Sequence, residues 1–281
     1  MGERGGRLPH VQLDQARPHA QRSGNDLGKN SSFATRLGVD HRGSTARTRS
    51  VEAILVHCLV SDGLTAAHIQ RGDARTLHDR PIVANAGVEV LEIDRSAVVL
   101  GSTQAADVID AQRAQALGFD VARRRSGGGV VVLQKGEHAW IDVTVPRGHR
   151  LWSDDVERAT WWVGDMWCAA LAAVSPHLPW SVHRERLVAS APERVVCFAS
   201  VGPGEVVQEG RKVVGISQRR TKDAARFQCT VFRHLDIDVH QALLRDGVPP
   251  SLAHARGVGD ALESLQVQVV AALCGAIART T

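Results

Sequence analysis

Three consecutive glycines, Gly127, Gly128 and Gly129, constrain this chain more than any other feature, because they separate two segments that are typical of strands. Basic residues at 123–125 precede them, and an apolar run at 130–133 follows. Glycine permits positive φ and lets backbone amides close on a ligand, while guanidinium groups suit phosphate or carboxylate. The segment predicts either an anion-binding loop or an ordinary turn with solvated arginines. It matches neither GxxxxGK[ST] nor GxGxxG.

The rest of the chain mixes strand and helix patterns. β-rich runs predict strands at 88–93, 97–100, 130–133, 138–145, 193–198, 205–208, 211–218 and 227–232, with a further strand reaching Val121. The first two of these read as a hairpin around residues 94–96. Helical spacing predicts helices over 105–117, from Asp154 or Asp155 to about Val174, around Leu243, and over 262–277. Without regular βαβ alternation, we expect the α+β class, with mixed or antiparallel sheets packed with helices.

Charge divides the chain into parts. Nine of the 34 basic residues but only four of the 30 acidic residues lie in positions 1–50, so the remainder is nearly neutral and no nucleic acid partner is expected. Positions 1–50 read as a disordered basic tail or a non-native extension. We expect a globular domain over 51–236 and a short helical segment over 237–281. No apolar run predicts a membrane span.

A second motif surrounds Lys212, one of four lysines among the 34 basic residues. It follows the turn Glu209-Gly210 and precedes apolar valines and Gly215. A lysine in such a place is either a compact ammonium for electrostatic work or an ordinary surface lysine.

Together these segments resemble the family of lipoate–protein ligase A and octanoyltransferases, whose catalytic fold is shared with biotin–protein ligases. The family's RRxSGGG motif is matched by Arg123, Arg124, Ser126 and the three glycines. Its GxKxxGxAxR hairpin is matched by Gly210, Lys212, Gly215 and Arg219, and its VxxGxxQ pattern by Val98, Gly101 and Gln104. The chain departs from the family where a His-Asp pair is replaced by Leu133-Gln134, and where a later His is replaced by Cys229.

The resemblance implies a lipoate/biotin ligase-like catalytic domain and a role for each matched residue. Lys212 would polarise the acyl carbonyl, and Arg123, Arg124 and the glycine amides would line the acyl and phosphate tunnel. Ser126, Gly215 and Gln104 would belong to the same substrate site. No metal ligand set is expected.

The function that the resemblance implies first is a lipoate–protein ligase-like enzyme that attaches a lipoyl or octanoyl group to a lysine of a lipoyl carrier domain. A cysteine-dependent octanoyltransferase and a non-catalytic acyl- or lipoyl-binding role remain open as alternatives. A ligase would use ATP and Mg²⁺ to form an acyl-adenylate; a transferase would need no cofactor and would pass octanoyl from acyl carrier protein through a cysteine thioester. The Cys-Phe pair of one transferase branch is matched by Cys197-Phe198, which otherwise reads as part of a buried strand. Cys229 is a weaker second candidate for the nucleophile.

The acceptors implied by the family are lipoyl carrier domains of 2-oxo acid dehydrogenase complexes or the glycine-cleavage carrier protein. The five cysteines are widely spaced and include no CxxC pair, which favours a reducing, cytoplasmic compartment.

Overall fold

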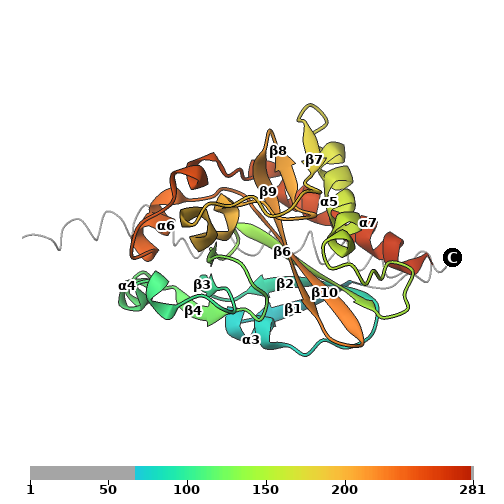
Figure 1. Cartoon of the computed structure of the whole chain (residues 1–281), viewed down its shortest axis with the longest axis horizontal. Coiled ribbons are helices and arrows are strands. Elements are labelled where there is room, and N and C mark those ends of the chain that lie inside the picture. Colours follow the sequence, from blue (N-terminus) through green and yellow to red (C-terminus); the bar gives the residue numbers. More distant parts are fainter. Residues whose placement is uncertain (1–66, 280–281) are drawn as a thin grey trace, which may run out of the picture. The chain divides into compact units, whose positions relative to one another are not determined.

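A computed structural model of the chain describes residues 67–279, which form two sheets packed with helices (Figure 1). The tail predicted for residues 1–50, and the first residues of the domain predicted from 51, lie outside the described residues. The combination of mixed sheets and helices confirms the α+β class.

The larger sheet has seven strands in the order β1-β2-β6-β10-β9-β8-β7. Its strands are β1 (Ala67–Gly72), β2 (Gly87–Ile93), β6 (His138–Pro146), β7 (Trp180–Val182), β8 (Val206–Gln208), β9 (Arg211–Arg220) and β10 (Ala224–Phe232). Neighbouring strands are antiparallel except β1 and β2, which are parallel. The smaller sheet has the order β4-β3-β5, formed by β3 (Ala97–Leu100), β4 (Asp120–Arg123) and β5 (Val131–Leu133).

Two long helices, α5 (Trp161–Val174) and α7 (Leu262–Ala278), contact each other and cover one face of the larger sheet (Figure 1). Trp167, Leu265 and Leu273 are fully buried there in one apolar core with Ile141 and Phe227 of the sheet. The segment Gly259–Ala278 is apolar and long enough for a membrane span, but half of it is buried inside the protein. The apolar character of α7 therefore matches its place in the core.

Three short helices begin at aspartates that cap them. Helices α3 (Ala74–Asp79), α4 (Ala111–Ala116) and α6 (Ile237–Leu243) follow Asp73, Asp110 and Asp236. Each aspartate side chain accepts a hydrogen bond from the backbone N–H three residues later, which satisfies a donor that the helix leaves free. Short 3-10 turns complete the described chain: η1 (Ala106–Val108), η2 (Arg158–Thr160), η3 (Pro192–Val195), η4 (Cys197–Ala199), η5 (Pro250–His254) and η6 (Gly259–Ala261).

The predicted hairpin of residues 88–93 and 97–100 is wrong. Strand β2 pairs with β1 and β6, while β3 joins the other sheet with β4 and β5. Residues 94–96 therefore connect the larger sheet to the smaller one, because each of the two strands pairs with strands that are distant in sequence. The strands predicted at 138–145, 211–218 and 227–232 are confirmed, and each continues for one to three residues beyond the prediction.

Two predicted elements are broken in the structure. The helix predicted over 105–117 is interrupted at Ile109, which is extended, buried and bridged to Leu244, so that α4 starts only after its cap at Asp110. The strand predicted over 193–198 is instead the 3-10 pair η3 and η4, with extended Val196 between them forming a bridge to Val130. The helix expected from Asp154 or Asp155 begins at Trp161, after the turn η2.

Candidate active site

Two of the three arginines before the glycines, Arg123 and Arg124, bind carbonyl groups of their own chain. Arg124 is buried and donates to Gly127 O at 2.9 Å and to Gly129 O at 2.8 Å. Arg123 donates to the carbonyl oxygens of Gly101 and Gln104, both at 2.7 Å. Both guanidinium groups therefore fix the shape of the loop, a structural role that the prediction of a phosphate-binding tunnel did not include.

Glycine is required where the loop touches its neighbours. A Cβ at Gly129 would lie 2.7 Å from Cys197 N and 2.8 Å from Arg194 O, which are backbone atoms. Val130, the next residue, donates to Val195 O and accepts from Cys197 N at 2.9 Å. The loop is thus held directly against the segment that carries Cys197.

The VxxGxxQ motif supports the same loop from behind. A Cβ at Gly101 would collide with Gly128 O, and Gly128 has φ of +99°. Gln104 accepts from Gly101 N at 2.9 Å and donates to Val195 O at 3.0 Å. Gln104 therefore links the loop to the cysteine segment through hydrogen bonds, which is a scaffolding role.

The lysine motif forms the predicted hairpin of β8 and β9. Its turn residues, Glu209 and Gly210, both have positive φ (53° and 75°), the conformation that a tight two-residue turn between antiparallel strands requires. Lys212, the second residue of β9, is only 3% exposed. Its ammonium group points inward, so the interpretation of Lys212 as an ordinary surface lysine is wrong.

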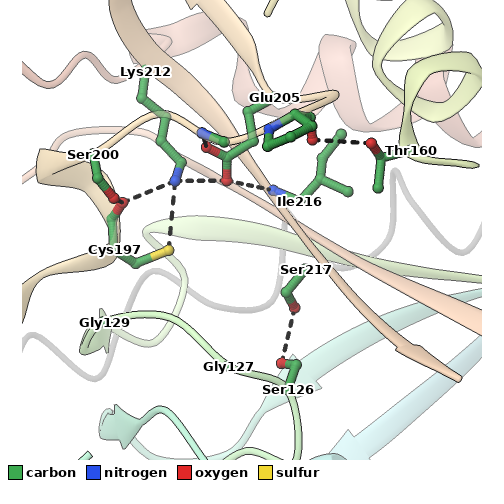
Figure 2. Close-up of polar contacts among 12 residues, drawn as sticks. Ser126, Gly127, Gly129, Thr160, Cys197, Ser200, Glu205, Lys212, Ile216 and Ser217 are labelled. Carbon is green, nitrogen blue, oxygen red and sulfur yellow. Dashed lines mark hydrogen bonds and ion pairs between the residues drawn. The ribbon is translucent and has the colours of Figure 1, made fainter. Parts of the chain in front are cut away.

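Lys212 Nζ contacts three acceptors (Figure 2). It lies 2.6 Å from Glu205 Oε1, 2.8 Å from the carbonyl oxygen of Cys197 and 3.5 Å from Cys197 Sγ. It also lies 5.2 Å from the ring centroid of Phe198. An ammonium group has three donors, so these acceptors account for all of them.

Glu205 is a site residue that the sequence reasoning missed, having assigned it only to the start of a strand. Its carboxylate is buried and also accepts from Ile216 N at 3.2 Å and Gly202 N at 2.7 Å. Its place follows from the strand register, which only the structure provides: Val206 pairs with Val214, so Glu205 lies beside the lysine strand. A buried ammonium requires a partner, and Glu205 is the acidic residue next to the hairpin.

Two opposing effects determine the charge state of Lys212. Burial lowers its pKa, but the attraction of Cys197 and Glu205, together with their hydrogen bonds, outweighs burial, and the pKa lies above its ordinary value. Lys212 is therefore a charged ammonium group at neutral pH.

The two cysteine candidates differ in environment. Cys197 is half-buried, and its sulfur faces the ammonium group and the glycine loop (Figure 2). Cys229 is fully buried in the apolar core, where burial raises the pKa of its thiol. A neutral thiol in the core is a poor nucleophile, so Cys197 is the cysteine that fits a reactive role.

Gly215 and Ser126 complete the surroundings. A Cβ at Gly215 would lie 3.1 Å from the Phe198 ring and 3.3 Å from Lys212 Cε. Ser126, in the glycine loop, donates to Ser217 Oγ of β9 at 3.1 Å. The structure thus gathers Lys212, Cys197, Gly129, Gly215 and Ser126, with Arg123, Arg124 and Gln104 behind them. In the described residues no group of three His, Cys, Asp or Glu side chains could hold a metal ion.

A small cavity of about 30 Å³ lies next to this cluster, between the two sheets. Its apolar wall consists of Val99, Val131, Leu133 and Trp140. Its polar wall consists of His78, Arg124, Ser217, Gln228 and Thr230. Leu133 stands where the family has a histidine and indeed faces the cavity. On β10, however, the residues that face the cavity are Gln228 and Thr230, while Cys229 points to the opposite core.

Comparison with known proteins gives a consistent result. The family model "Lipoyl protein ligase A/B catalytic domain" matches residues 88–271. A lipoate-protein ligase A bound with ATP is similar in structure, with 16% identity and a TM-score of 0.58, covering 74% of this chain and 83% of that chain. A T. acidophilum protein with bound lipoic acid is also similar, with 14% sequence identity and a TM-score of 0.57, covering 74% of this chain and 84% of that chain.

A third structure is a bi-partite lipoate protein ligase from Thermoplasma acidophilum, described with its E2 lipoyl domain. It is 15% identical with a TM-score of 0.54, and 74% of this chain and 82% of that chain are covered. No curated protein sequence gives a significant match. At these identities the structural likeness concerns the fold.

Proposed function

Because the chain belongs to the lipoyl protein ligase A/B catalytic-domain family, we propose that it transfers an octanoyl or lipoyl group to a lysine of a lipoyl carrier domain through a thioester on Cys197. The observation that carries this proposal is the contact of 3.5 Å between Cys197 Sγ and Lys212 Nζ. An ammonium group beside a sulfur stabilises the thiolate, which is the nucleophilic form of cysteine.

In the first step, the Cys197 sulfur attacks the carbonyl carbon of an acyl thioester on acyl carrier protein. A bond forms between this sulfur and the acyl carbon, and the donor's carbon–sulfur bond breaks. The donor leaves as a thiol, carrying the proton that Cys197 gave up. No nucleotide takes part, because the energy of the donor thioester is kept in the new thioester.

Lys212 serves this step twice. Before the attack, one of its N–H groups faces the Cys197 sulfur. Once the sulfur is acylated it carries no negative charge, and that N–H is free to bind the acyl carbonyl oxygen. Lys212 then stabilises the oxyanion that develops in the second step, while Glu205 and the Cys197 carbonyl hold the ammonium group in place.

In the second step, the amine of the carrier-domain lysine attacks the acyl carbon. An amide bond forms, the bond to the Cys197 sulfur breaks, and the proton lost by the amine returns to that sulfur. The acceptor class follows the family, whose structures include a ligase described together with its E2 lipoyl domain.

An ATP-dependent ligase is the competing function, supported by the structural likeness to a ligase bound with ATP. In that reaction the loop arginines would meet the nucleotide phosphates. Here Arg124 is buried and its Nε and Nη2 groups bind Gly127 O and Gly129 O, so these donors already hold the loop and would not be available to a phosphate. We prefer the thioester route because of the contact between Cys197 Sγ and Lys212 Nζ.

The test is intact mass spectrometry of an apo lipoyl domain incubated with the protein and one of two donors. One sample contains octanoyl–acyl carrier protein without nucleotide, and the other contains octanoate or lipoate with ATP and Mg²⁺. We expect acylation in the first sample, loss of acylation in Cys197→Ser, and acylation retained in the matched variant Cys168→Ser on α5. Acylation restricted to the second sample, and unaffected by Cys197→Ser, would establish a ligase instead.

A further inference from the structure

We propose that the cavity between the two sheets selects a medium-chain acyl group bearing a hydroxyl near its distal end over an unsubstituted alkyl chain. This inference rests on the proposed function, because it assigns the substrate class of the same site. It comes from the polar wall of the cavity.

The cavity lies within reach of an acyl group on Cys197. Lys212 Cε lies next to Gly215, and Ser217, which lines the cavity, follows two residues later on β9. Two residues of strand span about 7 Å, a length that a medium-chain acyl group covers. From the other side, Arg124 lines the cavity and binds Gly129 O, and Gly129 packs against Cys197.

The face of the larger sheet that forms the cavity floor carries a row of polar side chains. The register aligns Glu89 of β2, Asp142 of β6, Gln228 of β10 and Ser217 of β9 across four neighbouring strands. Asp142 is fully buried, and it accepts from Trp140 Nε1 at 2.8 Å and from Gln228 Nε2 at 3.4 Å. Glu89 and Asp142 are paired with Arg80, while Gln228 and Ser217 line the cavity, where a pocket for a plain alkyl tip would have apolar residues.

His78 gives the second, independent observation. It is 8% exposed, lines the cavity and stacks on Trp140 with ring centroids 4.3 Å apart. Within the described part of the chain, its Nδ1 atom is buried without a hydrogen-bond partner. An unpaired buried nitrogen is costly, and the ring that carries it is part of the cavity wall.

A hydroxyl matches this lining better than a charged group does. Burial, followed by repulsion from Arg124, keeps the His78 ring neutral, and a neutral imidazole nitrogen either donates or accepts according to the tautomer. Ser217 and Thr230 likewise do both, and a hydroxyl can complement any of them. A volume of about 30 Å³ holds one or two waters, which suits the tip of a chain.

The experiment is a competition between two donors. Equal amounts of octanoyl–acyl carrier protein and 8-hydroxyoctanoyl–acyl carrier protein are offered to the full-length protein, and the two products on the lipoyl domain are resolved by intact mass. We expect the hydroxylated product to exceed the plain one about tenfold, the effect of one hydrogen bond to an otherwise unpaired buried group. Equal transfer, or preference for plain octanoyl, overturns the proposal while leaving the proposed function standing.

Variants and a binding measurement complete the test. His78→Phe keeps the aromatic stack but removes the nitrogen, and should bring the product ratio close to one; Thr230→Val should lower it less. The matched change His177→Phe, at an exposed position, should leave the ratio unchanged. If neither donor is used, the proposed function fails. Calorimetry with free 8-hydroxyoctanoate and free octanoate then still tests the cavity assignment. Binding of 8-hydroxyoctanoate that is about tenfold tighter upholds the assignment, and equal binding overturns it.

Discussion

At the scale of single residues, the site depends on a buried charge pair. Breaking a buried pair by removing one partner costs about 3–5 kcal/mol, because the other charge is left uncompensated. Glu205 and Lys212 are both almost fully buried, with their charged atoms 2.6 Å apart. The acidic partner therefore decides whether the lysine can stay charged inside the protein.

Glu205→Gln should lower the free energy of unfolding at pH 7 by about 3 kcal/mol. The raised pKa of Lys212 means that its contribution is fully present below the ordinary value of 10.5 and is lost as pH rises through the folded-state pKa. Glu205→Gln should lose that contribution. On the alkaline limb of the pH–rate profile, its acyl-transfer activity should begin to fall at a lower pH than the activity of wild type. Urea unfolding and a pH–rate profile measure both, with exposed Glu209→Gln as control; an unchanged profile would contradict this role.

His78 makes a second prediction at this scale. Its pKa is lowered from 6.5 to about 3, first by burial and then by repulsion from Arg124. Asp79 raises the pKa by a smaller amount, and Arg80 and Arg226 lower it further. Above pH 6.5 the histidine is neutral in both the folded and the unfolded protein, and its contribution to the free energy of unfolding is fully present. As pH falls from 6.5 towards the folded-state pKa, only the unfolded protein binds the proton, so this contribution is lost. Between pH 6.5 and 4, wild type should therefore lose up to about 3 kcal/mol relative to His78→Phe.

The comparison with the variant is needed because a neighbouring group acts in the opposite direction. Burial raises the pKa of Asp142 to about 6 despite Arg80 and Arg226, so its contribution to stability decreases as pH rises from about 4 to 6. Unfolding of wild type and His78→Phe at several pH values separates the two. Parallel curves for the two proteins would mean that His78 is not held neutral.

At the scale of elements, the backbone of the glycine loop packs directly against the 3-10 turn η4, so neither can move without the other. Gly129→Ala would place a Cβ less than 3 Å from backbone atoms of the cysteine segment, so either that segment or the loop must move. We expect a loss of about 2 kcal/mol of stability and a changed rate of Cys197 alkylation. Gly127→Ala, which has no atom within 4 Å of the added carbon, should change stability by less than about 0.5 kcal/mol. Equal stability losses in the two variants would contradict direct packing of Gly129 against η4.

The elements also indicate how far the sequence could lead. Strands β6, β9 and β10 were predictable because their β-rich runs are long and their turn signals clear. The 193–198 segment was misread because apolar valines beside Cys197 suggest a strand, whereas Pro192 starts a 3-10 turn. The lysine hairpin was found by its glycines, but Glu205 required the strand register that only the structure provides.

At the scale of the whole molecule, sheet membership was not predictable. The pairing of β2 with β1 and β6, and of β3 with β4 and β5, depends on contacts between segments that are far apart in sequence. The cavity follows from that arrangement, since its walls come from both sheets. Because side chains alternate along a strand, Gln228 and Thr230 of β10 face the cavity and Cys229 faces the opposite core.

Charge gives a prediction for the entire chain. All of the excess positive charge lies in residues 1–50, which hold nine basic and four acidic residues, and the remainder is close to neutral. Deleting residues 1–50 should abolish any retention on heparin or duplex DNA at low salt, while acylation of a lipoyl domain continues. Retention of the shortened protein would show that the charge count is a poor guide to its surface.

The contact of Gly101 with Gly128 has a consequence for how variation in this protein is interpreted. Position 101 is almost a hundred residues before Cys197, yet a side chain there would displace the carbonyl of Gly128. Gly129 is bonded to Gly128 and packs against Cys197, so the displacement would reach the sulfur. A substitution that looks remote along the chain would thus alter the reactivity of the cysteine, and in relatives the glycines at positions 101 and 128 should be retained or lost together.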